Sequence, residues 1–313
     1  MMPGAKSPLA IAVHGGAGTL DPALMTPDKE AAYRAALGRA VRSGHQVLLA
    51  GGSSLDAVEA AVRVLEDSPL FNAGRGSVFN AQGLHEMDAA VMRGSDLGTG
   101  AVAGVQNVKN PVSLARRVME RSGHVLLSGR GAFEFAHQQR VELEDDAYFF
   151  DQLRHDQWQE VRGTAAVRLD HSEGEKKFGT VGAVALDAHG NLAAATSTGG
   201  MTNKRWGRIG DSPVPGAGTY ANNATCAVSC TGNGEAFLRA VAAHDVHALM
   251  AYKGLSLQEA VRTVVHEKLP PLDGEGGLIA VDRQGHLVLD FNCTGMYRAS
   301  INAQGVEQAA IFR

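Results

Sequence analysis

Cysteine is scarce in this chain, and its few cysteines form no familiar motif. There are 3 in 313 residues, and none has a CxxC spacing. An odd number of cysteines without such spacing argues against a disulfide framework and against a thiolate zinc site. We therefore expect buried free thiols at Cys226, Cys230 and Cys293.

The patterns that mark nucleic-acid-binding and membrane proteins are also absent. The formal net charge is −4 and no long basic run occurs, so no nucleic-acid partner is expected. No apolar stretch reaches the roughly 18 residues of a membrane-spanning helix, and residues 1–10 lack the apolar segment of a signal peptide. The sequence thus predicts a cytoplasmic protein without a membrane partner.

Two common catalytic or ligand-binding signatures are missing as well. The GxSxG motif does not occur. The glycine-rich turn at residues 14–18 follows an apolar strand, but its spacing fits neither GxGxxG nor the P-loop. Nucleotide binding is therefore not expected, and we interpret this turn as the wall of a site, shaped by its backbone amides or by His14.

Glycine, in contrast, is abundant at 38 residues, and one glycine marks a junction. A charged, turn-prone segment at residues 168–177 precedes Gly179, and an apolar run typical of a buried strand follows Thr180 at residues 181–186. If the bond between them were cut, Thr180 would carry a hydroxyl nucleophile and a free α-amine, which titrates near ~8 and can accept the proton. The alternative is that Gly-Thr simply begins a strand.

Local patterns predict helices and strands on both sides of this junction. Thr26 is a typical N-cap before Pro27, and residues 51–52 form a glycine turn between two helices. Further helices are expected at residues 111–121, 131–139, 234–252 and 256–268. Strands are expected at residues 86–92, 100–105, 181–186, 192–197, 219–229, 278–281 and 287–291. Such a mixture predicts an α/β protein with helices covering two stacked sheets, a four-layer αββα sandwich.

One long segment does not fit a regular element. Residues 140–177 are polar, with a weak helical pattern only at residues 149–158. Long irregular segments inside compact domains are usually lids, linkers or processing segments, and proteolytic nicking concentrates in them.

Polar clusters that could carry chemistry interrupt the strands after Thr180, at residues 195–200, 208–213 and 229–235. The last combines a hydroxyl with backbone amides at a helix N-terminus, which is the form expected of an oxyanion hole. Arg208 and Asp211 could bind the two charges of a free amino acid, or form a salt bridge with each other. Separately, the loop at residues 65–76 could hold a cation with backbone oxygens, or be a plain connection.

Several of these runs resemble the plant-type asparaginase/isoaspartyl peptidase family. The resemblance spans nearly the whole chain and is carried by residues 14–18, 69–74, 86–90, 100–105, 179–187, 195–204, 207–213 and 229–235. It implies the N-terminal-nucleophile (Ntn) hydrolase fold over a single domain, residues 1–313. It also implies autocleavage between Gly179 and Thr180 into an α subunit, residues 1–179 with the linker at about 140–179, and a β subunit, residues 180–313. The subunits would pair as an (αβ)2 dimer.

The resemblance also implies a reaction. Thr180 would attack the side-chain amide of L-asparagine, or the β-linkage of an isoaspartyl dipeptide, and water would resolve the acyl-enzyme. Thr198 would support the Thr180 hydroxyl, while Thr231 and Gly232 would stabilise the oxyanion. On the substrate side, Arg208 would hold the α-carboxylate, Asp211 with Gly234 would receive the α-amine, and Asn72 would lie near the nucleophile.

No catalytic cofactor is implied, but a structural sodium ion is. Its ligands would be backbone carbonyls of the loop, those of Leu65, Glu66, Ser68, Phe71, Ala73 and Arg75. One residue departs from the family pattern, Asn233, where the family often has a small or hydroxylated residue. Its side chain could change the room beside the α-amine pocket and so the substrate preference.

Two rival functions remain at this stage. A glycosylasparaginase would cleave a sugar–asparagine link, but the run at residues 198–204 is more similar to the isoaspartyl branch. A non-catalytic binding module with the same fold would not need Thr180, Thr198 and Thr231, which are all present.

Overall fold

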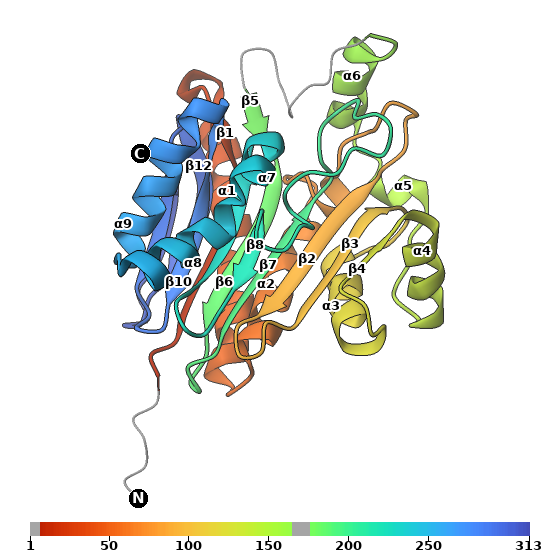
Figure 1. The fold of residues 1–313 in the computed structure, drawn as a ribbon. Helices are drawn as coiled ribbons and strands as arrows, with labels where there is room; N and C mark the ends of the chain where they lie inside the picture. The colour runs from red at the N-terminus through yellow and green to blue at the C-terminus, as the bar shows by residue number, and fades with distance from the viewer. Residues whose placement is uncertain (1–6, 165–175) are drawn as a thin grey trace, which may run out of the picture.

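The computed structural model describes residues 7–164 and 176–313. A nine-stranded sheet and a four-stranded sheet face each other, and helices cover the outer face of each (Figure 1). The predicted four-layer αββα sandwich is therefore confirmed. Within the described ranges, no helix combines the length and the apolar character needed to cross a membrane.

The large sheet is antiparallel except between its last two strands. Its order is β13 (Glu307–Phe312), β12 (Gly295–Ile301), β1 (Ala10–Thr19), β6 (Thr180–Leu186), β7 (Leu192–Thr198), β2 (Met87–Arg93), β3 (Thr99–Val105) and β4 (Leu126–Ser128), with β5 (Lys176–Phe178) also paired to β1. The strands before and after Gly179 alternate across this sheet: β1 lies between β12 and β6, and β7 lies beside β2.

The small sheet is wholly antiparallel. Its order is β11 (Leu287–Phe291), β10 (Gly276–Asp282), β9 (Cys226–Gly232) and β8 (Thr219–Ala221). The strand region predicted at residues 219–229 contains two strands, because a turn divides it into β8 and β9. The side chain of Asn222 accepts a hydrogen bond from Ala224 N at 2.8 Å, which closes that turn. Strands β12 and β13 lie outside the predicted elements.

Three helices cover the large sheet: α1 (Pro27–Leu49), α2 (Ser54–Glu66) and α3 (Pro111–Arg121). The first begins at the predicted cap, where Thr26 Oγ1 accepts a hydrogen bond from Lys29 N at 3.3 Å. Three more lie towards the β3–β4 side of the molecule, α4 (Gly129–Gln138), α5 (Asp146–Phe149) and α6 (Gln152–Val161) (Figure 1). The weak helix of the polar segment corresponds to α6, while residues 165–175 of that segment lie outside the described ranges.

The small sheet is covered by α7 (Gly234–Ala240), α8 (Ala242–Lys253) and α9 (Leu257–Arg262), the last continuing as a π-helical turn at Thr263–Lys268. The single helix predicted at residues 234–252 is wrong, because Val241 adopts a left-handed conformation with φ of 48°. The amides of Ala243 and His244 donate instead to the carbonyls of Ala217 and Gly216. Short 3-10 turns occur at Pro22–Leu24, Gly74–Gly76 and Pro270–Leu272.

Small apolar side chains fill the space between the two sheets. Ala10, Ala12 and Ala194 of the large sheet belong to one core cluster with Ala227 and Ala280 of the small sheet, so the layers can approach closely. The three cysteines are free and buried, as predicted. Burial raises the pKa of the Cys226 thiol to about 12, which makes it a packing residue and not a nucleophile.

Candidate active site

The proposed nucleophile and its predicted support lie side by side in the large sheet. Thr180 is the first residue of β6 and pairs in register with Thr198, the last residue of β7. Thr180 Oγ1 donates a hydrogen bond to Thr198 Oγ1 at 3.2 Å, and the amide of Gly200 also donates to that oxygen at 3.0 Å. Both threonines are buried, so burial and these hydrogen bonds restrict the position of the Thr180 hydroxyl.

The Gly179–Thr180 bond lies where the pairing with β1 shifts by one residue. His14 pairs with Gly182, whereas Ala17 pairs with Phe178. Two residues of β1 therefore face three residues of the other segment, at positions 179–181. Such a bulge bends the backbone and is common next to active sites.

Asn72 holds the turn that follows Thr198. Its side-chain oxygen accepts from Val78 N at 3.0 Å and its amide donates to Gly200 O at 2.7 Å. Its backbone oxygen accepts from Gly199 N at 2.9 Å. Asn72, which was predicted to bind substrate, thus lies close to Thr198. Both polar atoms of its side-chain amide already form hydrogen bonds with backbone groups.

Arg208 forms a two-pronged ion pair with Glu235. Both contacts, Nε to Oε1 and Nη2 to Oε2, are 2.8 Å long. This pairing raises the pKa of Arg208, although burial acts against it. The predicted alternative of a salt bridge with Asp211 is not what the structure contains, and Glu235 was not among the predicted site residues. A carboxylate nonetheless occupies the guanidinium fork, as a substrate α-carboxylate would.

Asp211 lies next to this pair as a buried carboxyl group. Only 4% of the residue is exposed, and its Oδ2 atom has no hydrogen-bond partner among the described residues. Burial raises the pKa of Asp211 to about 7, while nearby Arg208 lowers it. A Cβ placed on Gly234 would be 2.7 Å from Arg208 Nη2 and 3.0 Å from Asp211 Oδ1. The glycine therefore leaves room for both charged groups beside its backbone.

The predicted oxyanion residues come from the opposite sheet. Thr231 and Gly232 end β9, and they pair with Gly277 and Gly276 of β10. The following residue, Asn233, donates its side-chain amide to Asp273 O at 3.2 Å. The side chain that departs from the family pattern is thus tied to the loop at Asp273.

Two buried charged side chains, those of Asp88 and Lys204, lie near Thr198. Asp88 on β2 pairs in register with Thr198, which places Thr180, Thr198 and Asp88 in one row across three strands. Asp88 Oδ1 accepts from Gly104 N at 2.8 Å, and Lys204 Nζ donates to Glu86 O at 2.7 Å. Burial raises the pKa of Asp88 and lowers that of Lys204, and each group partly offsets the effect on the other. Both lie within the runs that carried the resemblance, but no sequence pattern predicts that each charge acts on the other.

The predicted cation loop folds back tightly on itself. A Cβ on Gly74 would be 2.5 Å from Glu66 O, and one on Gly76 would be 2.1 Å from Phe71 O. Carbonyl oxygens therefore crowd this turn, and such a donor set suits a hard cation. The Glu66 side chain points elsewhere: it accepts from Ser197 Oγ at 2.6 Å and from Val112 N at 3.0 Å. The residues present fit a cation held by backbone oxygens.

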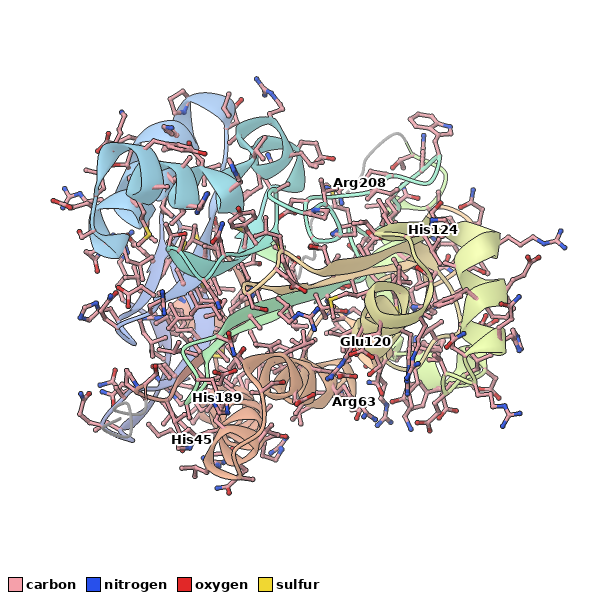
Figure 2. The ribbon with its side chains drawn as sticks, turned by 60° about the horizontal axis from the view of Figure 1, so that its bottom comes forward. His45, Arg63, Glu120, His124, His189 and Arg208 are labelled. Atoms are coloured by element: carbon pink, nitrogen blue, oxygen red, sulfur yellow. The ribbon has the colours of Figure 1, made fainter. Side chains whose placement is uncertain are left out.

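One cavity of the molecule is separate from this site. It has a volume of about 390 Å³ and is lined by residues of α2 and α3 with the loop after α4, among them Arg63 and Glu120. Figure 2 shows Arg63 and Glu120 near each other and apart from Arg208.

The chain is similar to known proteins over nearly its whole length. A family model described as asparaginase matches residues 7–311. The isoaspartyl peptidase of Escherichia coli (strain K12) is 54% identical over 307 residues, which cover 97% of this chain and 96% of that protein. The isoaspartyl peptidase/L-asparaginase of Mus musculus is 41% identical over 304 residues, which cover 97% of this chain and 90% of that protein. By the match over nearly its whole length and by these identities, the chain belongs to the asparaginase family.

Proposed function

We propose that this protein hydrolyses β-aspartyl amide bonds, those of isoaspartyl dipeptides and of L-asparagine, with Thr180 as its nucleophile. The observation that carries the proposal is the buried pair of Thr180 and Thr198 hydroxyls at the shifted ladder. The names of the relatives support the substrate class. The first test is a denaturing gel of purified protein combined with ammonia release from asparagine: two fragments and activity are expected, and one inert chain would contradict the proposal.

Maturation uses the same hydroxyl as catalysis. Thr180 Oγ attacks the carbonyl carbon of Gly179, the peptide C–N bond breaks, and the Gly179 acyl group moves from nitrogen to oxygen as an ester. Water then hydrolyses this ester, which leaves a Gly179 carboxylate and a free Thr180 amine. The amine is the base that the nucleophile needs.

Hydrolysis then follows from the positions of the charged groups. Arg208 holds the α-carboxylate of the substrate and Asp211 its α-ammonium group, so the side-chain carbonyl lies over Thr180. The Glu235 carboxylate must share or leave the Arg208 fork when the substrate arrives. Thr180 attacks, its amine takes the proton, and Thr231 with Gly232 stabilises the oxyanion. Ammonia or an amino acid leaves with that proton, and water releases aspartate from the ester.

The ionisation of Asp211 gives a pH dependence. Only the ionised carboxylate attracts the substrate ammonium group, and its pKa of about 7 means that ionisation is completed above neutrality. We expect kcat/KM for asparagine to rise with pH through about 7, and the corresponding limb of kcat to lie lower, because the bound ammonium group favours the ionised form. Full pH–rate profiles measure both. In Asp211→Asn only a limb from the Thr180 amine, near ~8, should remain; an unchanged limb near 7 would assign it elsewhere.

A sodium ion in the loop after α2 is part of the proposal. The backbone carbonyls of Leu65, Glu66, Ser68, Phe71, Ala73 and Arg75 would hold it, and it would supply structural rigidity and no chemistry. Exchange of sodium for choline should lower the thermal unfolding midpoint by about 2–4 °C if the ion is worth about 1 kcal/mol. Equal midpoints in the two salts at matched ionic strength would argue against the site.

The subunit arrangement follows from maturation. The two fragments would stay together because their strands alternate in one sheet, and we propose that two such cleaved units form the (αβ)2 dimer. Size-exclusion chromatography with light scattering of the cleaved protein tests this step. The cytoplasmic location stays a prediction from the sequence.

A further inference from the structure

A chain of buried polar side chains connects the two sheets directly beneath Thr180. We propose that His14 is a positioning residue for the nucleophile: its ring donates a hydrogen bond to the Thr180 carbonyl and thereby fixes the backbone of that residue. The Nδ1 atom of His14 lies 3.1 Å from Thr180 O. The proposal rests on the proposed role of Thr180 as nucleophile.

The chemistry of the two partners sets the proton positions on the ring. A carbonyl oxygen can only accept, so Nδ1 must carry the hydrogen. His14 is fully buried, and burial lowers its pKa to about 3, so the ring is neutral at physiological pH. The Nε2 atom is therefore bare and accepts a hydrogen bond.

The same reasoning orders the rest of the chain. Ser229 Oγ lies 2.9 Å from Nε2 and must donate to it. Ser229 has then used its only hydrogen, so Thr196 donates to Ser229 at 2.7 Å in preference to Gly218 O at 3.3 Å. Thr219 in turn donates to Thr196 at 2.6 Å. The hydrogen bonds thus run in one direction, from the small sheet to the Thr180 carbonyl, and fix the tautomer that this carbonyl requires.

The backbone around Thr180 explains why such a contact matters. The β1 ladder is shifted at this point, and Gly15 and Gly16 lie opposite residues 179–181. The direction of the carbonyl sets ψ of Thr180 and so the position of its α-amine relative to the carbonyl. After cleavage the amine has lost its covalent link to Gly179, and the carbonyl contact remains to orient it.

A glycine makes the contact possible. A Cβ on Gly182 would be 2.0 Å from Ser229 Oγ and 2.5 Å from His14 Nε2. Any side chain there would displace the ring or the serine. The small residue opposite His14 in the ladder is therefore a requirement of this network.

Two substitutions of His14 test the roles of the two ring nitrogens separately. In His14→Asn the amide nitrogen can replace Nδ1 and still donate to Thr180 O, whereas in His14→Gln the amide reaches the position of Nε2 instead. We expect His14→Gln to lower kcat for asparagine by about 10- to 100-fold, as for loss of one buried hydrogen bond, and to slow maturation. KM should not change, because the ring does not contact substrate. His14→Asn should stay within about threefold of the wild type.

A double-mutant cycle tests the relay even if one variant is unstable. Ser229→Ala removes the donor to Nε2. We therefore expect the single variant Ser229→Ala to have a lower kcat than the wild type, and the double variant His14→Asn/Ser229→Ala to have the same kcat as His14→Asn. Equal losses in His14→Asn and His14→Gln would mean that the ring only fills space, and additive losses in the cycle would separate Ser229 from His14. The wild type is measured first. A wild type that is not cut before Thr180 would contradict the proposed function. An active wild type together with a fully active His14→Gln variant would contradict only the inference about His14.

Discussion

Replacement of Thr180 by alanine is expected to yield one uncut chain without measurable hydrolysis of asparagine. In the proposed mechanism the same hydroxyl attacks Gly179 during maturation and the substrate afterwards, so its removal would eliminate both reactions. We expect the activity to fall by at least about 10⁴-fold, as for the loss of a catalytic nucleophile. A denaturing gel, N-terminal sequencing and an ammonia assay measure the two effects on the same sample.

The matched control for this variant is Thr180→Ser, which keeps a hydroxyl on the same atom. It should still be cut into fragments of 179 and 134 residues (313 − 179), though more slowly, because serine lacks the methyl group that restricts the rotamer. Fragments with a new terminus at position 180 in the alanine variant would refute the assignment of the nucleophile.

Replacement of Arg208 by alanine is expected to reduce kcat/KM for asparagine by about 10²- to 10³-fold and to leave maturation nearly unchanged. The guanidinium fork can make two charge-assisted contacts with the substrate carboxylate, and loss of such a two-pronged contact accounts for an effect of this size. The precursor has no substrate carboxylate to bind, so its cleavage does not need the fork. Time courses of cleavage and steady-state kinetics on fully cleaved protein separate the two.

Glu235→Gln serves as the matched control, since it removes the resident carboxylate and keeps the fork. We expect its KM for asparagine to fall severalfold, because the substrate no longer competes with a charged neighbour. If Arg208→Ala impaired maturation and hydrolysis equally, Arg208 would hold the loop together and would not be a substrate anchor.

The elements with strong local signals could be predicted from the sequence. Thr26 before Pro27 and the glycine turn before Ser53 placed α1 and α2 correctly, because caps and breakers act within a few residues. The break at Val241 could not be predicted in this way. Its backbone conformation is determined by carbonyls of the loop at residues 216–217, which are distant in sequence.

The same distinction between local and long-range determinants applies to the residues of the candidate site. Thr180 and Thr198 belong to strands that a hairpin joins, so their pairing follows from register. The partner of Arg208 could not be predicted in this way, because Glu235 lies 27 residues further along the chain on another element. Likewise, the proximity of Asp88 and Lys204 to Thr198 could not be predicted, because it depends on the placement of β2 beside β7.

The alternation of strands in the large sheet has a further consequence for the life of the enzyme. Separating the fragments would require opening the seams between β12 and β1, between β1 and β6, and between β7 and β2, and each half would then present bare hydrogen-bonding edges to solvent. The proposed cleavage would therefore be irreversible in practice. Halves synthesised independently would meet as incomplete sheets prone to aggregation, so the two-piece enzyme would have to fold first as one chain.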